Sequence, residues 1–520
     1  MSYAKVLCAA MLGMGGHLAE VEACVAPGLP ALIMTGLPDP ALNESRERVR
    51  AAITNAGGSW PYQRISVNLS PAYLRKFGSC FDLPIALAVL GADGQLPMQG
   101  LARVLVVGEL GLDGSVRPVR GVLPMVAAVL RQGVRRAIVP ESNAPEAALV
   151  PGVHVLAARH LAGVIGFLRG AGTLDSPPTR EPSPPPERAD LIDVAGQFMG
   201  RLAVEVAAAG GHHLALFGSP GGGKTMLANR LPSVLPELSD EEALEVTSIH
   251  SVAGVLPPES ALLRWPPLQA PHHTSSVTAL VGGGGGLARP GALSLAHHGV
   301  LLLDEAPEFP RRALEALRQP LEEGFIVIGR TDGTVVYPAT VQLVLTANPC
   351  GCSPRAGGFK CECSSAARLR YGRRLSGPLL DRIDIQLTLE PVSTAELVAE
   401  DSMRESSATV AARVATARAA AADRWAPVGW RTNAQVPGRT LRDRRWRLPR
   451  EATAELGRQL DLGGVSSRGY DRVTRLAWTI ADLLGRQTPG PAEVGLALSL
   501  RRNLPHGPKG LDLMAKRGTA

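Results

Sequence analysis

The string GSPGGGKT at residues 218–225 constrains this chain more than any other stretch. It fits the template G-x-x-x-x-G-K-[ST], in which a glycine-rich turn joins a strand to a helix. The apolar run HHLALFG (212–218) precedes it and the helix-forming run KTMLANRLPSVL (224–235) follows it. Backbone N–H groups of such a turn and of the helix N-terminus bind phosphate. The sequence therefore predicts an α/β fold built around a phosphate-binding loop.

Two further motifs place acidic and amide side chains at the ends of predicted strands, where they could act on a phosphate bound by this loop. The run GVLLLDE (299–305) reads as a buried strand ending at Asp304, which would hold Mg²⁺, and Glu305, which would orient or deprotonate an attacking water. Paired acids after a strand can also form a solvated turn. The run VQLVLTANP (341–349) ends at Asn348, whose amide could polarise that water or could simply begin a turn before proline.

The predicted ligands of this site are ATP and Mg²⁺. Lys224 places a positive charge at the β- and γ-phosphates, and Thr225 offers its hydroxyl to the metal, together with Asp304. The residues expected to contact the nucleotide are Gly218, Ser219, Pro220, Gly221, Gly222, Gly223, Lys224, Thr225 and Asp304.

Two arginines are candidates for a role in phosphoryl transfer. Arg382 stands between two aspartates in LLDRID, and Arg468 stands at the start of a predicted helix in SSRGYDRVTR. An arginine supplied by an adjacent subunit stabilises charge on a transferring phosphoryl group. Surface salt bridging is the alternative for each.

A proline-rich stretch divides the chain. The segment DSPPTREPSPPPER (175–188) lacks the apolar residues that would order it and predicts an extended linker. We therefore expect four parts, which are an α/β domain, the linker, an α/β ATPase core and a mostly helical tail. Their boundaries are 1–172, 173–189, 190–392 and 393–520.

Composition limits the function classes. No apolar run approaches the roughly 20 residues that span a bilayer, so a membrane protein is not expected. The first residues, MSYAKVLCAAMLGMGG, loosely imitate a secretion signal but are expected to form a buried strand. Seven cysteines, an odd number in a long chain, argue against a disulfide framework, and an ATP-dependent protein is expected in the reducing cytoplasm. A net charge of +7, concentrated in arginine runs at 370–375 and 442–450, favours a polyanionic partner, although each run could be a solvated face.

Long strings give the chain a specific resemblance. The sequence resembles the magnesium-chelatase-like AAA+ ATPases, and among them the YifB/ComM family, whose best-studied member is a hexameric branch-migration helicase of natural transformation. The resemblance covers nearly the whole chain. The strings that carry it are VNLSPAYLRKFGSCFDLPIALAVL, GSPGGGKTMLANRLPSVLP, APHHTSSVTALVGGGGGLARPGALSLAHHGVLLLDEAPEF, LEALRQPLEEG, TANPCGC and GPLLDRIDI.

The resemblance implies a role for each candidate. Lys224 and Thr225 would contact nucleotide and magnesium, Asp304 and Glu305 would be the Walker B pair, and Asn348 the sensor-1 residue. Arg382 would be the arginine finger acting in trans and Arg468 the sensor-2 arginine of the helical lid.

The long interval between the Walker motifs implies an insertion. Its tip would be the glycine-rich run LVGGGGGLARPG (280–291), either a pore loop that touches DNA or a plain flexible excursion. The run FIVIGRTDGTVVYP (325–338) predicts a β-hairpin, which fits the presensor hairpin of this branch. Arg330 on it could contact phosphate or be solvated.

The first domain resembles the Lon-protease fold. Ser79 falls near the nucleophile region of that fold, but the segment matching its catalytic lysine offers Leu123. Without an amine or imidazole base beside it, a serine hydroxyl is a poor nucleophile. We therefore expect a non-proteolytic scaffold or partner-binding module.

Cysteine and histidine groupings raise the question of a second metal. Four thiols within fourteen positions could close a tetrahedral zinc site or could remain free and reduced. They are Cys350, Cys352, Cys361 and Cys363. Histidine pairs occur at 212–213, 272–273 and 297–298, where adjacent strand residues would point to opposite faces. Such pairs are not expected to chelate one ion, and structural or DNA-proximal roles are favoured.

These observations predict a cytoplasmic, ring-forming ATPase, a homo-oligomer with six subunits expected, that acts on single-stranded or branched DNA by branch migration or as a helicase. One alternative is a chelatase-type motor for porphyrin metallation, against which the extra first domain and the cysteines argue. Another is an ATP-dependent protease or regulatory module.

Overall fold

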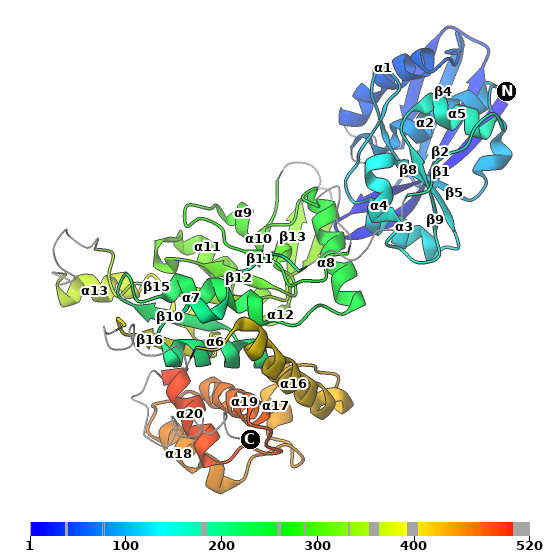
Figure 1. Ribbon diagram of the computed structural model, residues 1–520. Helices are drawn as coiled ribbons and strands as arrows, with labels where there is room; N and C mark the ends of the chain where they lie inside the picture. The colour runs from blue at the N-terminus through cyan, green and yellow to red at the C-terminus, as the bar shows by residue number, and fades with distance from the viewer. Residues whose placement is uncertain are drawn as a thin grey trace.

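The computed structural model describes residues 2–36, 40–74, 76, 78–177, 185–256, 262–284, 288–330, 333–352, 363–392 and 404–502. Along these residues the chain forms an N-terminal sheet domain, a central α/β domain and a C-terminal helical domain, arranged in that order from one end of the molecule to the other (Figure 1). Of the predicted linker, residues 178–184 lie outside the described part.

The N-terminal domain is built on a seven-stranded sheet in the order β3-β4-β2-β1-β5-β8-β9. The run that imitates a secretion signal forms β1 inside this sheet, paired antiparallel with β2. The residues of helix α2 are almost all buried. The strands are β1 (Ser2–Leu12), β2 (Gly15–Ala26), β3 (Ala31–Thr35), β4 (Arg64–Ser70), β5 (Val104–Val106), β8 (Arg136–Pro140) and β9 (His154–Ala158). The main helices are α1 (Pro40–Asn55), α2 (Asp82–Ala92), α3 (Val122–Leu130) and α5 (Leu161–Leu168).

The central domain contains a five-stranded parallel sheet in the order β11-β12-β15-β10-β16. Its inner strands are apolar and buried on both faces, which is why they read as continuous apolar runs rather than as alternating ones. The strands are β10 (Leu214–Gly218), β11 (Leu268–Gln269), β12 (Val300–Leu303), β15 (Gln342–Ala347) and β16 (Ile385–Leu389). The three strands predicted from the phosphate loop, the acidic pair and Asn348 are β10, β12 and β15.

The predicted insertion between the two nucleotide motifs is present. It contains α8 (Asp240–Ala253), which begins with a capping box between Ser239 and Glu242, and the short helices α9 (Val277–Val281) and α10 (Ala292–Leu295). The predicted hairpin is also confirmed, since β13 (Phe325–Arg330) pairs antiparallel with β14 (Gly333–Pro338).

The N-terminal domain contacts the central domain through this insertion and hairpin. Gly121, at the start of α3, donates its backbone N–H to the carbonyl of Ser251 on α8 at 3.2 Å. Val335 and Tyr337 of β14 are buried in the same apolar cluster as the N-terminal sheet. The two domains therefore share part of one core.

The C-terminal domain is helical in its described residues. α19 (Ser467–Leu483) confirms the helix predicted to begin at Arg468. The other main helices of the mostly helical tail are α16 (Ser407–Trp425), α18 (Arg450–Asp461) and α20 (Pro491–Arg502). Trp425 is fully buried against Trp446 and Trp478. Among the helices of the described ranges, none combines the length and the apolar character needed to cross a bilayer.

Candidate nucleotide-binding site

The phosphate loop joins β10 to α7 (Lys224–Arg230), as the sequence predicts. Two glycines are required by its geometry. A Cβ on Gly218 would lie 2.5 Å from the carbonyl oxygen of Leu389 on β16, and Gly223 has a φ of +80°, in the left-handed region that favours glycine. Gln197 holds the loop by donating from Nε2 to the Gly222 carbonyl at 3.1 Å. Sequence reasoning did not identify Gln197.

Lys224 lies within this loop with 7% of its surface exposed. Its Nζ donates to the carbonyls of Gly218 and Ser219 at 2.9 and 2.8 Å. Burial lowers the pKa of the amine, while Asp304 and Glu305 act in the opposite direction. Among the described residues no carboxylate lies within ion-pair distance of this amine, so an anionic ligand could pair with its charge.

Thr225 and Asp304 meet across the C-terminal edge of the sheet. Thr225 Oγ1 donates to Asp304 Oδ1 at 2.9 Å, and the hydroxyl of Thr346 on β15 donates to the same oxygen. Thr346 also accepts the backbone N–H of Glu305 at 3.0 Å. A hydroxyl beside a carboxylate is the kind of oxygen ligand set that Mg²⁺ takes. Sequence reasoning missed Thr346, although a polar residue inside an apolar strand is a detectable signal.

Glu305 lies one residue beyond Asp304 with an exposed side chain and a φ of +51°. A left-handed conformation is uncommon for a residue other than glycine and occurs often at functional sites. His273 Nδ1 lies 3.8 Å from Glu305 Oε2. The pairing brings a residue of the insertion to the acidic pair, a contact that the sequence did not indicate.

Asn348 follows the last residue of β15 and is half-buried. Because β15 lies between β12 and β10, Asn348 stands at the sheet edge between Asp304 and Gly218. This edge therefore brings together the phosphate loop, both acids and the amide.

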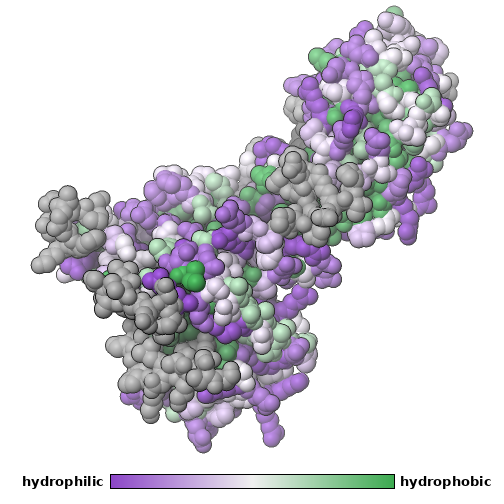
Figure 2. Space-filling model, viewed as in Figure 1, coloured by the Kyte–Doolittle hydropathy of each residue, from purple (hydrophilic) through white to green (hydrophobic). Residues whose placement is uncertain are grey.

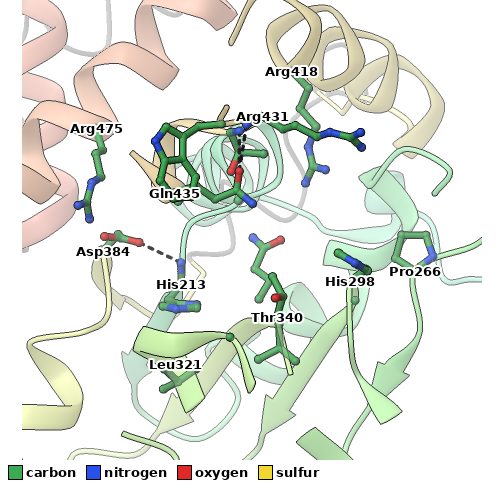
Figure 3. Close-up of a pocket in the computed structure, with 18 of the residues that line it drawn as sticks. His213, Pro266, His298, Leu321, Thr340, Asp384, Arg418, Arg431, Gln435 and Arg475 are labelled. Atoms are coloured by element: carbon green, nitrogen blue, oxygen red, sulfur yellow. Dashed lines mark hydrogen bonds between the residues drawn. The ribbon is translucent and has the colours of Figure 1, made fainter. Parts of the chain in front are cut away.

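The opposite edge of the sheet opens into a cavity of about 1030 Å³ between the central and helical domains (Figure 3). His213 and Asp384, which precede β10 and β16, line it from the sheet side, and Arg475 lines it from α19. Arg382 and Arg468 also line this cavity. Strands of four to six residues separate the two edges by roughly 13–20 Å. Neither arginine therefore lies beside the phosphate loop of its own chain.

The two arginines are held differently. Arg382 is 9% exposed, forms an ion pair with Glu322 at 2.6 Å and donates to the Pro378 carbonyl at 2.7 Å. Arg468 is the second residue of α19 and is exposed. Arg382 is thus ion-paired in a largely buried position and not at the surface. This ion pair does not prevent a second partner, since a guanidinium has five N–H donors.

Asp384 joins the core to the helical domain at this edge. Its carboxylate is 2% exposed and receives Arg472 of α19 at 2.6 Å and the backbone N–H of His213 at 3.3 Å. His212 Nδ1 lies 3.4 Å from it, while His212 Nε2 lies 2.7 Å from Thr479 Oγ1 of α19. Arg472 and the two histidines hold the pKa of Asp384 well below its ordinary value even though burial opposes this.

The expectation that paired histidines point apart is wrong at 297–298. These residues precede β12 rather than lie in it, and His298 has a φ of +54°. Both rings reach Glu245 Oε2, at 3.1 and 3.3 Å. The backbone N–H of Thr340 donates to His297 Nδ1 at 2.9 Å, so Nε2 of the neutral ring carries the proton. Because a protonated nitrogen is no metal ligand, we interpret this cluster as a hydrogen-bonded support.

Three of the four predicted cysteine ligands converge. The sulfur atoms of Cys350, Cys352 and Cys363 all lie within 4.8 Å of one another. Cys350 and Cys352 approach to 2.8 Å. Cys361 lies outside the described residues.

The predicted DNA-contacting elements are described in part. The base of the glycine-rich loop is closed by paired backbone hydrogen bonds between Gly283 and Arg289, at 2.9 Å in each direction. Residues 285–287 at its tip lie outside the described part, as does the side chain of Arg330.

In the N-terminal domain, the hydroxyl of Ser79 donates to the carboxylate of Glu109. Leu123 is fully buried at the start of α3. A leucine at that position supplies no base to the serine.

Comparison with known proteins gives one family match in each of the three domains. Family models described as subunit ChlI of Mg-chelatase, magnesium chelatase subunit ChlI, and magnesium chelatase subunit ChlI C-terminal match residues 21–143, 190–397 and 404–501. An uncharacterized protein of Mycobacterium tuberculosis (strain H37Rv) is 52% identical over 96% of this chain and 99% of its own length. The protein YifB of Escherichia coli (strain K12) is 41% identical over 93% of this chain and 94% of its own. The competence protein ComM of Haemophilus influenzae is 38% identical over 96% of this chain and 98% of its own length. The chain belongs to the YifB/ComM family of magnesium-chelatase-like AAA+ ATPases.

Proposed function

We propose that this protein is an ATP-driven motor that assembles into a ring, with six subunits expected, and acts on DNA as a branch-migration enzyme or helicase. The observation that carries the proposal is the division of the catalytic groups between two edges of one sheet. Lys224, Thr225 and Asp304 would hold ATP and Mg²⁺ at one edge, while the candidate arginines lie at the other.

This division favours a site completed by a neighbour. When the cavity edge of one protomer faces the phosphate loop of the next, Arg382 and Arg468 can approach the nucleotide bound there. Glu305 would then activate water, Asn348 would orient it, and the guanidinium groups would stabilise charge on the transferring phosphoryl group. Hydrolysis in this proposal depends on assembly.

DNA is the proposed polyanionic partner. The glycine-rich loop and the β13–β14 hairpin would contact it. The name of the relative ComM, a competence protein, supports a role in recombination or natural transformation. The cytoplasm is the proposed location. The ATPase rate of the purified protein, measured without DNA and with single-stranded, duplex and branched DNA, tests this. Stimulation by DNA is expected, whereas stimulation only by a porphyrin-binding partner subunit would favour a chelatase motor.

The converging thiols are proposed to hold Zn²⁺, with Cys361 as the fourth ligand. A tetrahedron with Zn–S bonds of about 2.3 Å places its sulfurs about 3.8 Å apart. All three sulfurs lie within 4.8 Å of one another, and those of Cys350 and Cys352, which are 2.8 Å apart, would have to separate by about 1 Å when zinc binds. Metal analysis of the purified full-length protein should give one zinc per chain, lost in the double substitution Cys350→Ser and Cys352→Ser. A metal-free wild-type protein would mean that these are reduced thiols only.

The N-terminal domain is proposed to be a Lon-like, non-proteolytic module that binds a partner or supports the motor. It contacts α8 of the insertion that carries the glycine-rich loop, and β14 of the hairpin. ATP-dependent degradation of unfolded casein that disappears in Ser79→Ala would contradict this assignment.

A further inference from the structure

The strongest concentration of charge in the molecule lies outside the site described above. Residues 431–450 contain seven arginines and one acidic residue, a net charge of +6 in 20 positions, whereas the whole chain carries +7. All seven arginine side chains are exposed. The arginines are Arg431, Arg439, Arg442, Arg444, Arg445, Arg447 and Arg450.

Most of this charge is not neutralised within the described chain. Arg442 pairs with Asp471, and Arg431 lies 3.5 Å from Glu242. The other five form no ion pair with any residue of the described ranges. Asp443, the one acid of the segment, accepts the backbone N–H of Arg445 at 3.0 Å and serves the local turn. The segment thus displays a surplus of guanidinium groups.

The segment is fixed to the domain by its apolar residues. Val436, Leu441 and Leu448 are buried in the core shared by the helical and central domains. Trp446 packs on the buried Trp425 with ring centroids 5.4 Å apart, and the Arg445 guanidinium lies 4.9 Å from the Trp446 centroid. The arginines are therefore presented from an ordered backbone, which lowers the entropy lost when they bind.

We infer that these arginines form a phosphate-binding surface for DNA on the helical domain, additional to the loop and hairpin proposed above. Of the seven, only Arg431 lines the cavity, so the charges follow the surface rather than converge on one small anion. A guanidinium matches a phosphate group with two parallel hydrogen bonds. An extended row of them fits a polymer with a phosphate at every step.

Two other partners fit less well. Membrane-surface segments place apolar side chains in the lipid, but Val436, Leu441 and Leu448 are buried here. An acidic face of a second copy of this chain would also match the charge, and the experiment below separates it from DNA.

Figure 2 shows strongly hydrophilic side chains projecting from the helical domain at the lower end of the molecule.

The test uses the full-length triple variant Arg444→Gln, Arg445→Gln and Arg447→Gln, because no ion pair within the described residues involves these side chains. The matched control is Arg131→Gln, Arg135→Gln and Arg136→Gln, which removes the same charge from exposed positions of the N-terminal domain. The affinity of each protein for a fluorescent 30-nucleotide single strand is measured by fluorescence anisotropy. The measurement is repeated at evenly spaced salt concentrations between about 50 and 300 mM.

The triple variant should lose at least about tenfold in affinity at 100 mM salt, and its slope of log K against log[salt] should fall by about 2. The control should keep the wild-type slope, and both variants should keep the DNA-free ATPase rate. An unchanged slope in the triple variant overturns the inference. So does loss of ATP-dependent assembly, measured by light scattering, which would assign the surface to the neighbouring subunit.

The inference rests on the proposed action on DNA, and the two can fail separately. If the wild-type protein binds no DNA at low salt, the proposed function fails with it. If the wild-type binds and only the glycine-rich loop is needed, this surface alone is refuted.

Discussion

Thr225 Oγ1 lies 2.9 Å from Asp304 Oδ1, although 79 residues separate them in the chain. The contact forms because β10 and β12 flank β15 in a parallel sheet, so their C-terminal ends share one edge. The hydroxyl of Thr346 fixes the carboxylate from the strand between them. The pair of candidate metal ligands is therefore oriented by a third residue in the protein itself.

Thr346→Val should slow ATP hydrolysis by about tenfold or more and raise the Mg²⁺ concentration needed for half-maximal rate. Valine keeps the shape but removes the donor to Asp304 and the acceptor for Glu305 N–H. Steady-state ATPase assays over a magnesium titration measure both effects. If the rate and the magnesium dependence match wild type, Thr346 does not orient the metal site.

Lys224→Ala should abolish nucleotide binding, since no other cation of the described residues donates to the loop carbonyls. Binding of a fluorescent ATP analogue measures this directly. Lys224→Arg serves as the companion variant, which retains charge but not the compact ammonium. Undiminished binding by Lys224→Ala would place the nucleotide elsewhere.

Glu305→Gln should bind ATP but hydrolyse it at least about a hundredfold more slowly, because the amide keeps the shape and cannot accept a proton from water. Equilibrium binding and single-turnover hydrolysis separate the two steps. Normal turnover would show that another group activates the water.

Arg382→Ala should reduce hydrolysis by about a thousandfold while leaving ATP binding intact. Mixing it with Lys224→Ala subunits should restore activity, because each mixed interface can combine an intact phosphate loop with an intact Arg382. Arg373→Ala, an exposed arginine on the same segment, is the control. Failure of the mixture to recover activity would contradict completion by a neighbour.

His213 should make stability depend on pH. Its Nδ1 accepts the backbone N–H of Leu343 at 3.0 Å, and burial lowers its pKa to about 4. The unfolded chain, with a pKa near 6.5, binds the proton first, so stability is complete above about pH 6.5 and falls as the pH drops toward 4. The loss approaches about 3 kcal/mol at most.

Chemical denaturation at pH 7.5, 6 and 5 measures this, with His213→Asn as the control that keeps an acceptor and does not titrate. The difference between the two proteins should shrink as the pH falls. Parallel pH profiles would show that His213 contributes nothing to them.

The sequence predicted what depends on local pattern. The phosphate loop, the strands before Asp304 and Asn348, the hairpin at 325–338 and the helices of the tail all follow from periodicity and turn chemistry. The hydroxyl inside an apolar strand marks Thr346 as unusual, but its role could not be predicted because the sequence does not show that this strand lies between β12 and β10. The histidines at 297–298 were misread because a strand was assumed where the backbone turns, at His298.

The position of Arg382 and Arg468 at the sheet edge opposite the phosphate loop could not be predicted from their spacing in the sequence. Both arginines line one cavity because the helical domain packs on the edge of the sheet where the strands begin. This packing depends on contacts between residues far apart in the sequence, so local sequence patterns do not predict it. Their roles remain predictions, as do those of the loop residues.

The buried carboxylate of Asp384 ties the first residues of β16 to Arg472 and, through the adjacent histidines, to α19. These buried contacts should keep the central and helical domains in a fixed orientation relative to each other. If ATP hydrolysis drives motion in an assembled ring, as proposed, the core and the helical domain of one protomer are expected to rotate as one rigid unit. The relative movement is then expected between neighbouring protomers.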